Sequence, residues 1–349
     1  MKINDLNVLV KHYAGSLSYG TNLPTSDVDV RGIFCADPIN IRTPFFPVGE
    51  VTIPEEEDSK LYELSKFIRL YVDGNPNILE TLWVDESDII ESSIEYDFLR
   101  SHAARLLSSK IAFTFSGYAF AQLKRIKGHN KWINSPQPVE PPKHMDYLKM
   151  IQNYTADKIM PRDFCILNYA NMGLVHYAGD TFGIVKENTG STVMTSDGDF
   201  NISVKQNKIV ETQETRPLFI FKYNKDEFLR ARDNHTNYWT WKNNRNEKRS
   251  ELEENFGYDT KHAMHLVRLL RMGEEILSGK GVIVKRPDAK ELLEIRNGSW
   301  SYEELLDYAH TKDDLIRNEL YKNTGLPKKP NIKLAADVLI SVQDMCWSK

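Results

Sequence analysis

One stretch near the N-terminus, AGSLSYGTNLPTSDVDVRGIF at positions 14–34, limits the folds open to this chain more than any other. An apolar run ends in Gly15-Ser16, ten residues follow, and Asp27 and Asp29 then alternate with valines. Apolar and β-branched residues in such short runs predict strands. The stretch therefore predicts two strands that are joined through a turn of small residues.

The two aspartates predict a metal site. Side chains at positions i and i+2 of a strand point to the same face, so the carboxylates of Asp27 and Asp29 are expected to project together. Two like charges that lie this close repel each other unless a cation sits between them. Carboxylate oxygens suit Mg²⁺ or Mn²⁺, and a third acid on a neighbouring strand would complete a site for two such ions.

Gly15 and Ser16 predict a phosphate-binding turn. A strand that ends in Gly-Ser and opens into a helix offers free backbone N–H groups and a hydroxyl to an anion. Alone, each pattern is common in surface loops and strands. Together they favour a single binding site, in which the turn binds a nucleoside triphosphate and the aspartates bind the metal ions that bridge its phosphates.

The rest of the chain suggests two packed units, because 349 residues exceed the usual size of one domain. We expect strands over 6–14 and 27–36, a short strand over 58–62, and a helix with Leu64, Phe67, Ile68 and Tyr71 on one face. Residues 101–178 read as mostly helical. A small β-rich insert is expected at about 179–221, with helices from there to the end.

Composition limits the surroundings of the protein. No apolar run approaches the length that spans a bilayer, the N-terminus does not read as a signal peptide, and the three cysteines are scattered. We therefore expect a cytoplasmic protein without a membrane partner. The net charge of −4 does not itself indicate nucleic-acid binding, but the segment KNNRNEKR at 242–249 is basic.

The motifs resemble a known family. GSLSYGTNLPTSDVDVRGIF, YELSKFIRLYVDGNPNILETLW, YWTWKNNRNEKR and YDTKHAMHLVRLL are together similar to the RNA-repair-associated family (RlaP or YcgL-like) of the DNA polymerase β-like nucleotidyltransferase superfamily. This resemblance implies an α+β (α/β) fold with a small mixed-sheet nucleotidyltransferase core at 1–100 and a mostly helical region at 101–349. It also implies transfer of a nucleotide from an NTP with Mg²⁺ or Mn²⁺. Leu17 departs from the basic or polar residue that the family often has after Gly-Ser.

The third acid has two candidates in the segment DSKLYEL. Asp58 falls at the expected strand, whereas Glu63 falls where the helix begins, a position that acids favour for structural reasons. We prefer Asp58 and keep Glu63 as the alternative. Asn75 and Glu80 are interpreted as a turn residue and an acid on a helix surface.

Two basic groups are candidates for substrate contact. Lys261, His265 and Arg268 fall on one face of a helix, where cations can bind nucleotide phosphates. Arg245 and Arg249 lie one helical turn apart and are predicted to bind the acceptor. His262 and His265 are not predicted as metal ligands, because no further His or Cys lies close to them in the sequence.

The sequence therefore predicts a metal-dependent nucleotidyltransferase that moves an NMP from an NTP to an acceptor hydroxyl. The family context and the basic residues favour an RNA end as the acceptor. A protein or small-molecule acceptor and a non-catalytic nucleotide or RNA binder remain alternatives. The sequence gives no oligomeric state.

Overall fold

A computed structural model describes residues 6–52, 59–154, 172–186, 191–204, 216–244 and 247–348, with the side chains of 247–250 excepted. The chain divides into two compact units. Unit 1 combines residues 1–134 with 247–349, and unit 2 is formed by residues 135–246. Unit 2 is thus inserted into the sequence of unit 1.

Unit 1 contains a five-stranded mixed sheet with the order β3-β4-β2-β1-β5. Strand β2 is parallel to β4, and the other neighbouring strands are antiparallel. The central pair, β1 and β2, matches the two strands predicted from the opening motif, although β2 begins at Asp29 rather than at Asp27. The strands are β1 (Asn7–Ala14), β2 (Asp29–Cys35), β3 (Glu50–Thr52), β4 (Lys60–Glu63) and β5 (Ile89–Ser92).

The helix that follows β4 confirms the periodicity of its sequence. Helix α3 (Leu64–Val72) buries all four of the predicted apolar residues. Its first N–H groups are capped by the side chain of Glu63, and Gly74 follows its end with a φ of 76°. The side chain of Asn75 then caps α4 (Pro76–Leu79), which confirms its interpretation as a turn residue.

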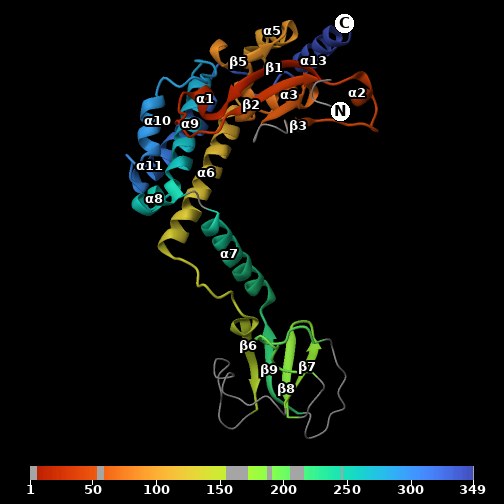
Figure 1. The fold of residues 1–349 in the computed structure, drawn as a ribbon, viewed down its shortest axis with the longest axis vertical. Coiled ribbons are helices and arrows are strands. Elements are labelled where there is room, and N and C mark those ends of the chain that lie inside the picture. The colour runs from red at the N-terminus through yellow and green to blue at the C-terminus, as the bar shows by residue number, and fades with distance from the viewer. Residues whose placement is uncertain are drawn as a thin grey trace. The chain divides into compact units, whose positions relative to one another are not determined.

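The other helices of unit 1 come from both of its sequence stretches (Figure 1). The long helices α6 and α9 pack closely along each other, and α10 and α11 pack on α9. The last helix, α13, returns to the N-terminal sheet, where Trp347 Nε1 donates to the carbonyl of Ala36 at 3.0 Å. The helices are α1 (Gly15–Tyr19), α2 (Pro38–Arg42), α5 (Ile94–Ser101), α6 (Ile111–Asn134), α8 (Glu247–Phe256), α9 (Thr260–Leu277), α10 (Ala289–Arg296), α11 (Tyr302–Asp314), α12 (Tyr321–Asn323) and α13 (Ile332–Trp347).

Unit 2 contains a four-stranded antiparallel sheet with the order β6-β9-β8-β7 and the helix α7 (Lys225–Asn243). Its strands are β6 (Leu148–Asn153), β7 (Gly173–Ala178), β8 (Thr181–Val185) and β9 (Pro217–Tyr223). The β-rich insert is confirmed, but the prediction that 101–178 is mostly helical is wrong for β6 and β7. Strand β6 pairs with β9 and strand β7 pairs with β8, and these pairings make both segments strands.

The predicted fold class is confirmed. The chain is α+β, with a small mixed sheet near its N-terminus and helices in its C-terminal part. In the described part of the chain, every helix is too short or too polar to cross a membrane.

Candidate active site

The turn and the strand of the opening motif lie against each other. Ala14, the last residue of β1, pairs with Asp29, the first residue of β2. Gly15 follows with a φ of 61°, and a Cβ added to it would lie 2.2 Å from Asp29 Oδ2. Glycine is therefore required here for two reasons. A residue with a side chain disfavours this backbone conformation, and any side chain would displace the carboxylate of Asp29.

The start of α1 is the turn that the sequence predicts to bind phosphate. The first N–H groups of a helix have no partner within it. In the described structure, Ala14 supplies no side-chain cap for them. Ser16 and Leu17 are both partly exposed, and they directly follow Gly15, the residue that approaches Asp29.

The two aspartates differ in their surroundings. Asp29 is half-buried at the start of β2, whereas Asp27 is exposed in the loop that precedes this strand. The exposed Val28 separates them. This arrangement leaves Asp27 able to adjust to a ligand, while β1 and Gly15 fix the position of Asp29.

The structure does not bring Glu63, the alternative third acid, to this end of the sheet. Glu63 pairs with Phe34, five residues from Asp29 along β2, which is a distance of about 16 Å in a strand. Its Oε2 accepts from the N–H groups of Ser65 at 2.7 Å and Lys66 at 3.3 Å. Burial raises the pKa of Glu63, although these N–H groups oppose the rise.

Asp58, the preferred third acid, lies outside the described residues. Its neighbour in the sequence, Ser59, is described, and the Ser59 hydroxyl accepts a hydrogen bond from the N–H of Val30 at 3.1 Å. The beginning of β4 therefore lies next to the beginning of β2, where Asp29 is.

Arg268 is not on an exposed basic face, which corrects the expectation from helical spacing. It is 5% exposed, and its Nη1 donates to Glu80 Oε1 at 2.8 Å. The Tyr19 hydroxyl donates to the other oxygen of Glu80 at 2.6 Å, and the guanidinium lies 3.8 Å from the centre of the Tyr19 ring. Burial opposes the charge of Arg268, but Tyr19 and Glu80 raise its pKa, so it stays charged.

This buried group, defined by Tyr19, Glu80 and Arg268, connects the candidate site to α9. Tyr19 is the last residue of α1, and Arg268 lies in the middle of α9. The interpretation of Glu80 as a surface acid is wrong, because Glu80 is 4% exposed. No local pattern could reveal the group, since Glu80 and Arg268 are 188 positions apart.

The other basic candidates differ in what they can offer. Lys261 is exposed near the beginning of α9, as expected for a phosphate contact. His265 is half-buried, and burial together with the charge of Arg268 lowers its pKa to about 3, so it is neutral at pH 7. Arg245 and the side chain of Arg249 lie outside the described residues.

Comparison with known proteins supports the resemblance seen in the motifs. Residues 2–147 match the model of RlaP, described as the RNA repair pathway DNA polymerase beta family. An uncharacterised 38.9 kDa protein from the nrdC-mobD intergenic region of Enterobacteria phage T4 is 26% identical over 141 residues. That match covers 35% of this chain and 40% of the phage protein. No solved structure matches. Over residues 2–147, the chain is therefore similar to the RNA repair pathway DNA polymerase beta family, the family that its motifs resemble.

Proposed function

We propose that this protein transfers a nucleotide from an NTP to an acceptor hydroxyl and that the acceptor is an RNA end. The observation that carries the proposal is the contact between Gly15 and Asp29. It places the first residue of the Gly-Ser turn directly beside a carboxylate, within the segment that matches a polymerase β family. A triphosphate and its metal ions need such a turn and a carboxylate side by side.

In this proposal, the backbone N–H groups at Ser16 and Leu17 and the Ser16 hydroxyl bind the phosphates of the NTP. Asp27 and Asp29 would hold Mg²⁺ or Mn²⁺, which supplies charge neutralisation and activates the attacking oxygen when bound. Their hard oxygen donors fit these ions. Asp58 is proposed as the third acid, which would help to hold the activating metal ion and would take the proton of the acceptor hydroxyl.

The remaining residues would act by positioning the nucleotide and the acceptor. The buried group Tyr19–Glu80–Arg268 holds the end of α1 against α9 and thereby fixes the turn that binds phosphate. Lys261 is the exposed cation of α9 and is proposed to meet the phosphates. We propose His265 as a neutral hydrogen-bonding group for the nucleotide, and Arg245 and Arg249 as contacts to the acceptor.

Two other functions use the same residues. The acceptor could be a protein side chain or a small molecule, because the side chains proposed to contact it, those of Arg245 and Arg249, lie outside the described residues. A binding protein without catalysis would not need Asp29 to be held as it is, so the contact with Gly15 favours the enzyme.

Transfer of label from each of the four α-labelled NTPs tests the proposal. The protein is incubated with Mg²⁺ or Mn²⁺ and with total RNA, total protein or buffer alone. We expect label on RNA that disappears in the double variant Asp27→Ala, Asp29→Ala. Label on protein would replace the RNA acceptor with a protein acceptor. NTP binding that needs no metal, with no label on any acceptor, would favour a binding protein.

Replacing Gly15 by alanine tests the contact itself. We expect Gly15→Ala to lower transfer strongly, because the new Cβ would push Asp29 Oδ2 from its place. The free energy of unfolding should fall by about 1–3 kcal/mol because of the positive φ. Gly279→Ala is the matched control, since Gly279 has a φ of 82° and no atom within 4 Å of an added Cβ. Equal transfer by the two variants would show that the contact with Asp29 has no catalytic importance.

A further inference from the structure

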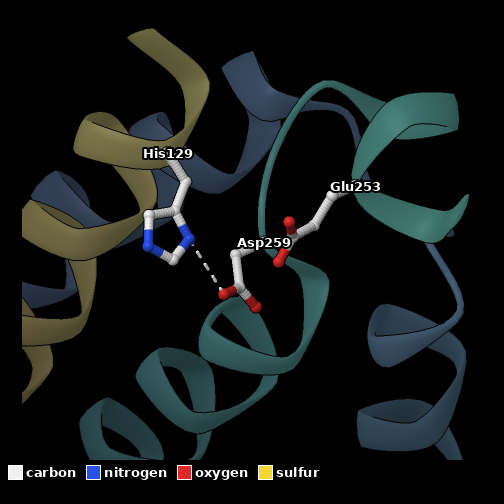
Figure 2. A group of neighbouring side chains, drawn as sticks. All are labelled: His129, Glu253 and Asp259. Carbon is white, nitrogen blue, oxygen red and sulfur yellow. Dashed lines mark hydrogen bonds and ion pairs between the residues drawn. The ribbon is translucent and has the colours of Figure 1, made fainter. Parts of the chain in front are cut away.

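A second group of metal-binding side chains lies in unit 1, away from the opening motif. His129 of α6, Glu253 of α8 and Asp259 at the beginning of α9 converge in Figure 2. One ligand atom from each lies within 4.8 Å of the other two. We propose that these three residues bind a divalent transition-metal ion such as zinc.

The donors indicate the class of metal. An imidazole nitrogen with two carboxylate oxygens is a ligand set that transition metals accept, whereas Mg²⁺ favours oxygen donors alone. Asp259 Oδ2 lies 3.2 Å from His129 Nδ1. Neighbouring ligands of a tetrahedral zinc ion lie about 3.4 Å apart, given zinc bonds of about 2.1 Å. This pair is therefore already at the separation that a shared ion requires.

The two oxygens of the Asp259 carboxylate have different partners. Oδ1 accepts from the N–H of His262 at 3.0 Å and so caps α9. Oδ2 faces the imidazole of His129 and lies 3.5 Å from His262 Nε2. The hydrogen bond from the His262 N–H fixes the orientation of the carboxylate, as outer partners do in metal sites.

Burial strengthens the attraction of the two carboxylates of this group for a cation. Glu253 is 1% exposed and the side chain of Asp259 is 0% exposed, while their ligand oxygens are close enough to repel each other. A divalent ion would compensate both. A cavity of about 610 Å³ lies near the group in the sequence, because its lining includes Asn130, next to His129, and Gly257, two residues before Asp259.

The site does not include Asp27 and Asp29, the aspartates proposed to hold the catalytic ions, although Lys261, proposed to meet the phosphates, follows Asp259 by two residues. Asp259 lies nine residues before Arg268, the residue that contacts Tyr19, and this spacing is about 13 Å along a helix. The ion would instead join the C-terminal part of α6 to α8 and α9. Its role is therefore structural, and it fastens the two sequence stretches from which unit 1 is made.

Zinc binding by the full chain tests the inference. The Asp27→Ala, Asp29→Ala chain is used as parent, so that ions in the proposed catalytic site are not counted. After treatment with a chelator, Zn²⁺ is titrated, and bound metal and melting temperature are measured. We expect one equivalent of zinc, a higher melting temperature with zinc, and no such increase with Mg²⁺.

Three further variants of this parent assign the ion to its ligands. Glu253→Gln and Asp259→Asn should each weaken zinc binding by at least about 100-fold. Both keep the shape of the side chain, and asparagine still caps α9. Glu251→Gln is the matched control, because Glu251 is an exposed acid of the same helix, and it should bind zinc like the parent. Absence of zinc in the parent, or undiminished binding by Glu253→Gln and Asp259→Asn, would overturn the inference.

Discussion

Replacement of Asp29 by asparagine is expected to lower nucleotidyl transfer by about 10³-fold while leaving the fold intact. The reason is that asparagine keeps the size of the side chain beside Gly15 but loses the charge proposed to hold the metal ions. Removal of one well-placed electrostatic group from an active site commonly costs 10²–10³-fold in rate. Steady-state transfer from labelled NTP measures the loss, and circular dichroism and thermal unfolding check the fold.

Asp37→Asn is the control for this variant. Asp37 is an exposed aspartate just beyond the opposite end of β2, and in the described structure its side chain makes no capping bond to α2. Transfer by Asp37→Asn should equal that of the unmodified protein. Transfer by Asp29→Asn within tenfold of the unmodified protein would contradict the role proposed for Asp29.

Replacement of Arg268 by leucine is expected to lower the free energy of unfolding by about 3–5 kcal/mol. The guanidinium is the partner of Glu80 in a buried ion pair at 2.8 Å, and its loss leaves a carboxylate that is 4% exposed without this compensation. Urea unfolding followed by circular dichroism measures the change. We also expect weaker NTP binding, since Arg268 braces Tyr19 at the end of α1.

The double variant Arg268→Leu, Glu80→Gln separates the charge from the packing. Glutamine is neutral and still accepts a hydrogen bond from the Tyr19 hydroxyl. It should therefore recover most of the stability that Arg268→Leu loses. If the double variant is less stable than Arg268→Leu, the buried charge of Glu80 is not the cause of the loss.

The local features of unit 1 could be predicted from the sequence because their causes are local. Periodicity placed Phe67 and Tyr71 in the core of α3, and alternation placed Asp29 at a strand. The small residues Gly15 and Ser16 predicted the turn beside Asp29. Glu63 falls where the helix begins, as expected, and its side chain accepts from the first N–H groups of α3.

The long-range features could not be predicted. Glu80 meets Arg268 across 188 positions, and His129 meets Asp259 across 130, so no window of sequence contains either pair. Strand β6 lies within the range predicted as mostly helical, and its sequence, LKMIQN, contains leucine, lysine and methionine, which form helices well. Its pairing with β9 overrides that propensity.

The insertion of unit 2 has a consequence for synthesis of the protein. The apolar side of α6, which includes Phe115, Leu123 and Ile126, is covered by packing that includes α9. The ribosome makes α9 only after all of residues 135–246. At about 5–20 residues per second, this delay is on the order of 10 s. Unit 2 can complete its sheet during that time. The first sequence stretch of unit 1 keeps apolar surface exposed until α9 is made, and chaperones can bind that surface.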